Sequence, residues 1–282
     1  MEAFVLAHEP ALRLAAFAAV LALMALWELL APRRTRSMAR RRRWPANIAI
    51  VILNTILVRL LLPAAAVSVA LSGETHGWGL LNQYALPSWA GITAGVVLLD
   101  LVIYLQHVMF HAVPVLWRLH RMHHADLDID VTTGARFHPV EIVVSMLIKF
   151  AAIAALGVPA VAVVLFEVLL NATSMFNHAN VRIPPVLDAA LRWLVVTPDM
   201  HRVHHSLERD ETNSNFGFNL PLWDRLFGTY RAQPRAGHQA MTVGIPDFRD
   251  AAACNTLAGM LAIPFQGQGA RRAQLEPHHE SR

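Results

Sequence analysis

Five histidines stand close together in residues 106–125, which read QHVMFHAVPVLWRLHRMHHA. They form one H-x-x-x-H pair and one H-x-x-H-H triplet, and a second triplet of the same spacing follows further along the chain. The members are His107, His111, His120, His123, His124, His201, His204 and His205. Side chains three and four positions apart share a face of a helix, so each motif is predicted to aim its imidazoles at one point. Because neutral imidazole is a common ligand of transition metals, the chain must fold so that these segments meet around metal.

The composition indicates a membrane protein. Hydrophobic residues make up 55% of the 282 residues and charged residues 16%, and the mean hydropathy is +0.39. An ordinary soluble domain is less apolar than this. Apolar runs close to the length of about 20 residues that crosses a bilayer are expected at 12–30, 47–71 and 89–110.

Two further apolar pieces predict a helical hairpin. They cover residues 142–156 and 159–175, and they are separated by Gly157, Val158 and Pro159. A glycine and a proline at this point interrupt a helix. The first arm is short, so a re-entrant hairpin remains an alternative to a spanning one. The expected fold class is an all-α, integral membrane bundle of about three spanning helices plus this hairpin.

The charge distribution predicts which side of the membrane holds the histidines. Seven arginines lie within residues 33–43, between the first two apolar runs. Such a cluster favours the cytoplasmic side, next to anionic lipid, and its position between apolar segments argues against nucleic acid as a partner. Counting crossings from there places the histidine motifs, His138 and His178 in a cytoplasmic, histidine-rich, metal-binding cap. The chain is thus expected to be a multi-pass membrane protein.

Polar stripes precede two of the histidines. Each stripe has the helical spacing i, i+4, i+7, i+11, and together they contain Asp100, Tyr104, His107, His111, Glu167, Asn171, Ser174 and His178. A metal-bound histidine usually donates its second N–H to a carboxylate or carbonyl. The polar residues before the histidines are therefore candidate partners of the metal ligands. For Asp100 an ion pair with Arg59, at similar depth in the preceding helix, is the alternative.

The motifs in combination resemble the fatty acid hydroxylase/sterol desaturase superfamily. Besides the histidine pair and triplets, the resemblance rests on FHPVE at 137–141, NHAN at 177–180 and LWDRLFGTY at 222–230. It covers roughly residues 99–230. It implies a membrane enzyme with a di-iron centre that uses O2 and supplied electrons to hydroxylate or desaturate a fatty acyl, sterol or related lipid. The ligands it implies are His107, His111, His120, His123, His124, His178, His201, His204 and His205, with His138 as a tenth candidate.

The donor set agrees with that chemistry. Nine or ten nitrogen ligands are too many for one ion and enough for two. Oxidation of an unactivated C–H bond requires a redox-active metal, which zinc is not, so two iron ions are expected. Nitrogen ligands select weakly against zinc, so zinc is a possible substitute in purified protein. The chain has one cysteine, Cys254, and no dinucleotide or haem motif, so an external electron donor of cytochrome or ferredoxin type is expected.

Two other classes remain as alternatives. A zinc-dependent membrane hydrolase would also use histidines, although the H-E-x-x-H motif is absent. A metal transporter or metal-binding membrane protein would hold its ligands near mid-bilayer. The expected domain organisation comprises N-terminal membrane helices with an arginine-rich loop (1–88), a catalytic domain (89–232) and a C-terminal segment (233–282) with a disordered tail from residue 266.

Overall fold

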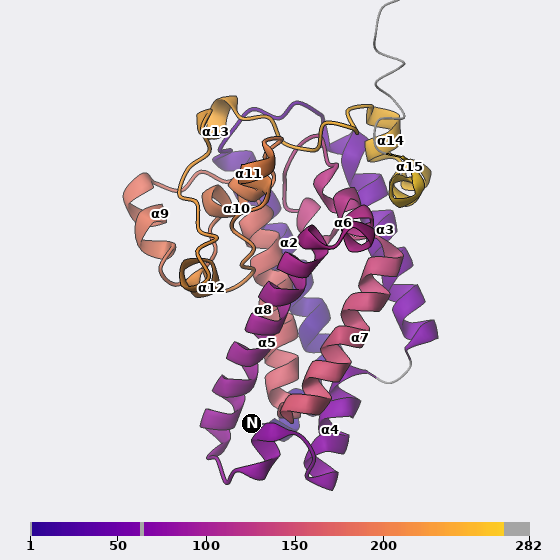
Figure 1. Ribbon diagram of the computed structural model, residues 1–282, viewed down its shortest axis with the longest axis vertical. Helices are drawn as coiled ribbons and strands as arrows, with labels where there is room; N and C mark the ends of the chain where they lie inside the picture. The colour runs from indigo at the N-terminus through magenta and orange to yellow at the C-terminus, as the bar shows by residue number, and fades with distance from the viewer. Residues whose placement is uncertain (1, 63–64, 268–282) are drawn as a thin grey trace, which may run out of the picture.

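The computed structural model describes residues 2–62 and 65–267, and within them the chain is helical, with no regular β-strand. Long helices form a bundle, and shorter helices and loops form a cap at one end of it (Figure 1). The disordered tail is expected from residue 266, and its part beyond residue 267 lies outside the described residues. The predicted all-α class is confirmed.

In the described part of the chain, five segments are long and apolar enough to cross a membrane. They are α2 (Glu9–Leu30), the segment Arg40–Gln83, α5 (Ser88–Ala112), α7 (Pro139–Leu156) and α8 (Ala160–His178). A short helix, α1 (Glu2–Ala7), precedes them. The two arms of the predicted hairpin are α7 and α8, each of sufficient length for a crossing, and Gly157 ends α7 in a left-handed conformation with φ 66°.

The second expected run is divided. Helix α3 (Arg40–Leu61) stops before residue 62, and α4 (Ala66–His76) begins inside the expected run and continues beyond its end at residue 71. A 3-10 turn, η1 (Leu80–Gln83), then leads to α5. Pro63 follows Leu62 in the sequence, and a residue before proline is disfavoured in the helical conformation. The single helix predicted for 47–71 is therefore wrong.

The cap consists of α6, the loop between α6 and α7, and the chain after α8 (Figure 1). Its helices are α6 (Pro114–His124), α9 (Pro185–Leu191), α10 (Pro198–His204), α11 (Arg209–Thr212), α12 (Leu222–Leu226), α13 (Gly237–Ala240), α14 (Ala251–Asn255) and α15 (Leu257–Ala262), with 3-10 turns η2 (Thr133–Ala135) and η3 (Ile263–Phe265). The cap ends of α5, α7 and α8 meet beneath it, which brings the histidine motifs together.

The arginine-rich segment is partly built into the cap. Arg43 is fully buried, and its guanidinium donates to Asp126 at 2.9 and 2.6 Å and to Asp130 at 2.6 Å. Its neighbours Arg41 and Arg42 are exposed. The prediction that this cluster lies beside lipid headgroups is therefore wrong for Arg43, whose charge holds α3 to the loop after α6.

The acidic side of this network is buried as well. Burial alone would raise the pKa of Asp126, but the charges of Arg43 and Arg136 lower it to about 2. Glu28 of α2 accepts hydrogen bonds from Val131 N at 2.7 Å and from Asn180 N at 2.8 Å. The N-terminal helices thus fix the backbone of the loop that follows the first histidine triplet.

Candidate metal centre

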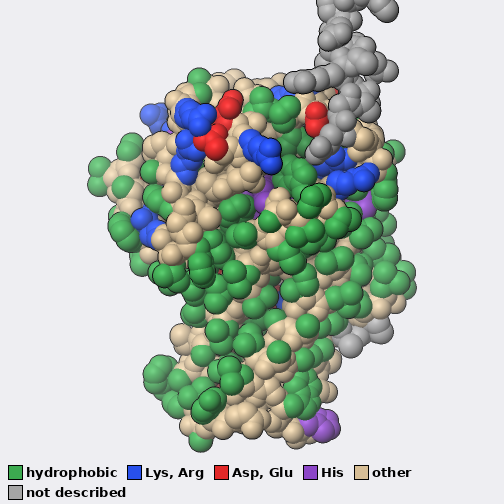
Figure 2. Space-filling model, viewed as in Figure 1, with side chains coloured by type: hydrophobic (Ala, Val, Ile, Leu, Met, Phe, Trp, Pro, Cys, Tyr) green, Lys and Arg blue, Asp and Glu red, His purple; other side chains and the backbone are tan. Residues whose placement is uncertain are grey.

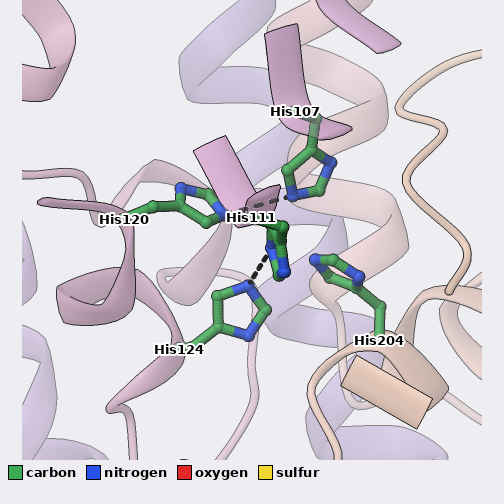
Figure 3. Close-up of side chains that lie close together, drawn as sticks. All are labelled: His107, His111, His120, His124 and His204. Carbon is green, nitrogen blue, oxygen red and sulfur yellow. Dashed lines mark hydrogen bonds between the residues drawn. The ribbon is translucent and has the colours of Figure 1, made fainter. Parts of the chain in front are cut away.

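Nine of the ten candidate histidines form two groups, within each of which the ligand nitrogens all lie within 4.8 Å of one another. The first group, five histidines from α5, α6 and α10, is drawn in Figure 3. It comprises His107, His111, His120, His124 and His204, and the second group comprises His123, His178, His201 and His205. The second group comes from α6, the end of α8, and α10 with its C-cap residue.

Each H-x-x-H-H triplet is shared between the two groups. From α6, His120 and His124 join the first group and His123 joins the second. At α10 the order is reversed, because His201 and His205 join the second group and His204 joins the first. Adjacent residues on a helix differ by about 100° in direction, so they cannot point to the same place. The prediction that every motif aims at one point is therefore wrong for the triplets and holds for the i, i+4 pairs.

His138 stands apart from both groups. It is the N-cap residue of α7, where Nδ1 accepts a hydrogen bond from Val140 N at 3.2 Å. Its Nε2 contacts the carbonyl of Leu261 at 3.4 Å. The structure thus gives His138 a role in starting α7, not among the clustered nitrogens.

The tautomers of the first group follow from its hydrogen bonds. His107 Nδ1 lies 2.7 Å from the carbonyl oxygen of Phe216, and His120 Nδ1 lies 2.6 Å from Glu141 Oε1. Carbonyl and carboxylate oxygens accept, so both Nδ1 atoms carry the proton. The two Nε2 atoms, 3.1 Å apart, then face each other with lone pairs and cannot share a hydrogen bond. A metal ion bound by both lone pairs would remove this repulsion.

The second group repeats this arrangement. His178 Nδ1 donates to Ser174 O at 2.7 Å and His123 Nδ1 donates to Arg136 O at 3.1 Å. Their Nε2 atoms again lie 3.1 Å apart. Nitrogen ligands bound about 2.1 Å from one ion at right angles would be about 3 Å apart, so the spacing matches ligands of a shared metal.

Buried nitrogens without partners support the same conclusion. Nε2 of His204 and Nε2 of His205 are buried and have no hydrogen-bond partner. His204 Nδ1 donates to the carbonyl of Ser214 at 2.7 Å, which leaves a lone pair on its Nε2. A buried polar atom without a partner is costly, and a metal ion in each group would satisfy these two. The residues present therefore fit two metal ions.

The protonation state of the ligands is also favourable. Burial, followed by the repulsion of neighbouring imidazoles, lowers the pKa well below 6.5 for five histidines outside the long helices. They are His123, His124, His201, His204 and His205. Imidazoles that are neutral at neutral pH are ready to bind metal without first losing a proton.

The side chains of the polar stripe residues were predicted to be hydrogen-bond partners of the histidines, but they bond to other groups. Asp100 accepts hydrogen bonds from Trp223 Nε1 at 2.8 Å and Leu220 N at 3.2 Å. Arg59 is exposed, so the alternative Arg59–Asp100 ion pair is wrong. Glu167 pairs with Lys149 and with Arg13, the latter at 2.7 Å.

Two other stripe residues also bond elsewhere. Asn171 donates to the carbonyl of Glu167 at 2.8 Å. Tyr104 O–H and Thr229 Oγ1 share a hydrogen bond of 2.8 Å. Thr229 donates to Asp224, which also accepts from Phe216 N at 2.8 Å. Tyr104 thus supports His107 only indirectly, through the segment whose carbonyl accepts the His107 proton.

The partners of the histidines were mostly invisible in the sequence. Four are backbone carbonyls, which carry no side-chain signature. Glu141 lies in the FHPVE motif, but its role was not predicted. Asn213, whose Oδ1 lies 3.2 Å from His111 Nδ1, lies in a polar stretch that offered no spacing signal.

Glu141→Gln is expected to lower metal affinity by about 10- to 100-fold, because the carboxylate that orients His120 and increases its basicity is lost. Competition with a chromophoric chelator would measure the change. The matched control is Glu208→Gln, a change on the exposed surface of the cap. Equal affinities for the Glu141→Gln variant and the native protein would contradict this role.

Comparison with known proteins agrees with the geometry. Residues 92–229 match the model of the fatty acid hydroxylase family. The chain is 29% identical to an ornithine lipid hydroxylase of Rhizobium tropici over 172 residues, 61% of this chain and 50% of the relative. It is 28% identical to the human alkylglycerol monooxygenase over 177 residues, 59% of this chain and 37% of that protein.

A third relative is a fatty acid hydroxylase of Lecanicillium, 27% identical over 145 residues, 47% of this chain and 40% of the relative. The chain thus spans half or less of the length of these relatives. No solved structure matches it. The segment that matches the fatty acid hydroxylase family contains all nine clustered histidines.

Proposed function

We propose that this protein is a membrane-bound di-iron oxygenase that hydroxylates a C–H bond of a lipid. The observation that carries the proposal is the pair of facing Nε2 lone pairs in each histidine group, 3.1 Å apart. The first group would hold one iron ion with five nitrogens and the second would hold the other with four. The printed names of the relatives, which are lipid hydroxylases and monooxygenases, favour hydroxylation over desaturation.

The reaction would place one oxygen atom of O2 in the C–H bond and release the other as water, with two electrons and two protons consumed. The irons would supply the redox chemistry that activates O2. The protein's own contribution is to gather nine imidazoles, five of them oriented by hydrogen bonds from Nδ1, and to shield them from water. The electrons would come from an external donor of cytochrome or ferredoxin type.

The donor set counts against the two alternatives. A catalytic zinc ion normally keeps three protein ligands and an open position, whereas the two groups here have five and four histidines. A transporter would hold its ligands near the middle of spanning helices. Here three of the nine histidines belong to α6, two belong to α10 and His205 directly follows α10, all outside the candidate spans.

We expect the purified protein to contain two metal ions per chain, part of which is zinc after overexpression. Elemental analysis would measure the content. When loaded with iron, the protein should consume O2 in the presence of a reductant and membrane lipid, and the zinc form should not. Finding one ion or none in a folded sample would contradict the two-metal proposal. O2 consumption independent of iron would contradict the oxygenase proposal.

We propose that the cap lies on the cytoplasmic side. The predicted cytoplasmic segments, residues 33–43 and 118–136, are joined by the Arg43–Asp126 contact, so they must share one side. A reporter fused after Tyr230, also in the cap, should therefore read as cytoplasmic, in line with the positive-inside rule. The matched control is a fusion after the exposed Tyr84, between α4 and α5 at the opposite end of the bundle (Figure 1). Exchange of the two signals would contradict the topology.

The catalytic domain expected at 89–232 remains part of this proposal. Its buried loop at residues 126–136 is hydrogen-bonded to Glu28 and Arg43, which belong to the N-terminal segment 1–88. It also depends on the C-terminal segment 233–282, where Cys254 O accepts from Arg136 Nη2 at 2.5 Å. We therefore propose that all three segments are needed for a complete metal centre.

A further inference from the structure

One edge of the cap is apolar. Hydrophobic side chains cover the left edge of the cap in Figure 2, where α9 lies in Figure 1. The most exposed of them lie in segments 185–194 and 222–227, and we call this set the lipid rim. It comprises Val186 (86% exposed), Leu187 (50%), Trp193 (68%), Leu194 (72%), Leu226 (64%) and Phe227 (51%). A projecting helix with apolar residues on most of its surface needs another apolar surface around it.

The charged side chains of the same two segments are bound within the protein. Asp188 and Arg192 form a 2.6 Å ion pair, in which both side chains are less than 10% exposed. Arg225 donates to the carbonyl of Arg192 at 3.1 Å, and its guanidinium lies 3.8 Å from the centre of the Trp193 ring. Asp224 is fully buried. The lipid rim therefore presents apolar atoms outward and keeps its charges on the inner side.

Contacts with α5 show how far the lipid rim extends alongside the bundle. Phe227 stacks on Tyr104, with ring centroids 5.4 Å apart, and Trp223 donates to Asp100. These α5 residues lie eight and twelve positions before its end at Ala112, or about 12 and 18 Å at 1.5 Å per residue. Segment 222–227 thus descends beside α5 from the cap.

The length of α5 allows the depth of these contacts in the membrane to be estimated. Its 25 residues extend about 37 Å, whereas the hydrocarbon core of a bilayer is about 30 Å thick. Even if the whole excess of about 7 Å stood at the cap end, Phe227 would lie about 5 Å inside the hydrocarbon. Leu105 of α5, 48% exposed, and Leu169 of α8, 46% exposed, continue the apolar surface at similar depth.

We propose that the lipid rim is inserted into the hydrocarbon of the cap-side leaflet, so that this edge of the cap is a membrane-embedded element. The partner is the acyl region of the bilayer. The guanidinium of Arg225 is held by the Arg192 carbonyl and the Trp193 ring, so insertion does not leave this charge free in lipid. Insertion also anchors the segment that carries Asp224. Asp224 accepts a hydrogen bond from Phe216 N, and the carbonyl of Phe216 orients His107.

Site-specific fluorescence in bilayers would test the insertion. Leu194→Cys and Leu226→Cys variants, labelled with an environment-sensitive fluorophore, would be placed one protein per nanodisc of phosphatidylcholine and phosphatidylglycerol. The native Cys254 is buried, and burial raises its pKa to about 11, so it should not compete for the label. Glu208→Cys, on the exposed outer surface of the cap, is the matched control.

Labels in the lipid rim should lose fluorescence with doxyl-labelled lipid and keep it with aqueous iodide, and the control should show the reverse. Iodide quenching at Leu194 and Leu226 equal to that at Glu208 would overturn the proposal. The same variants would also be measured in nanodiscs that hold two chains. Protection from iodide that is seen there but is lost in single-chain nanodiscs would mean that a second copy covers the rim, and would also overturn the proposal. Metal content, measured on the same samples, would identify any variant that has lost its fold.

Discussion

His205→Ala is expected to lower the metal content of the purified protein from two ions per chain towards one and to abolish lipid hydroxylation. The second histidine group has four members, so this change leaves three nitrogens for its ion. His204→Ala, one residue earlier, removes a member of the first group, which retains four. The His204 variant should therefore keep more metal than the His205 variant, although the two positions are adjacent. Elemental analysis of both proteins after identical purification would measure the difference.

His138→Ala is the control for this comparison. His138 lies in a family motif but outside both groups, so its variant should retain both ions, with a moderate loss of stability from the lost helix cap. Thermal unfolding would confirm that all three variants are folded. Metal contents that are equal in the His204 and His205 variants, or a loss of one ion in the His138 variant, would contradict the assignment of histidines to the two groups.

Arg43→Met is expected to lower the free energy of unfolding by about 3–5 kcal/mol, because it leaves buried carboxylates without their counter-charge. Asp126 and Asp130 both depend on this guanidinium, and neither is exposed. For a protein of this size the change corresponds to a fall of on the order of 10 °C in Tm. Thermal unfolding in detergent, followed by tryptophan fluorescence, would measure it.

Arg42→Met is the matched control, since Arg42 is the preceding residue and is exposed. A surface change of this kind is expected to alter stability by no more than about 0.5 kcal/mol. Arg43→Lys should fall between the two, because it keeps the charge and loses the forked geometry that reaches both carboxylates. Equal stability of the Arg42 and Arg43 variants would show that the buried network is not needed for the fold.

The histidine pattern predicted much of the clustering of these side chains because helical spacing is a local property. The i, i+4 pairs His107–His111, His120–His124 and His201–His205 each stay in one group. The same geometry could have predicted that His123 and His204 point elsewhere, since each is adjacent to a member of such a pair. Most of the candidate membrane helices could also be predicted from the sequence. The length of apolar sequence that a span needs, about 20 residues, is set by the thickness of the bilayer and not by tertiary contacts.

Long-range partners could not be predicted in the same way. The carbonyl that fixes His107 belongs to Phe216, 109 positions away, and any residue type provides a carbonyl. Arg43 was one of seven similar arginines, and only the fold distinguishes the buried member from its exposed neighbours. The sequence DLDID at 126–130 has an acidic residue at every second position, and this was the signal available for the partner of Arg43. Such a pattern does not identify which arginine pairs with it.

The separation between Arg43 and Asp126 imposes a sequence of events during synthesis. The two residues are 83 positions apart, so at about 5–20 residues per second the arginine leaves the ribosome roughly 4–17 s before its carboxylate partner. During that interval an unpaired guanidinium cannot be buried without a large desolvation cost. Arg43 must therefore wait in water or among lipid headgroups with Arg41 and Arg42. The nascent N-terminal helices stay loosely placed until the first histidine triplet and the acidic loop behind it have been made.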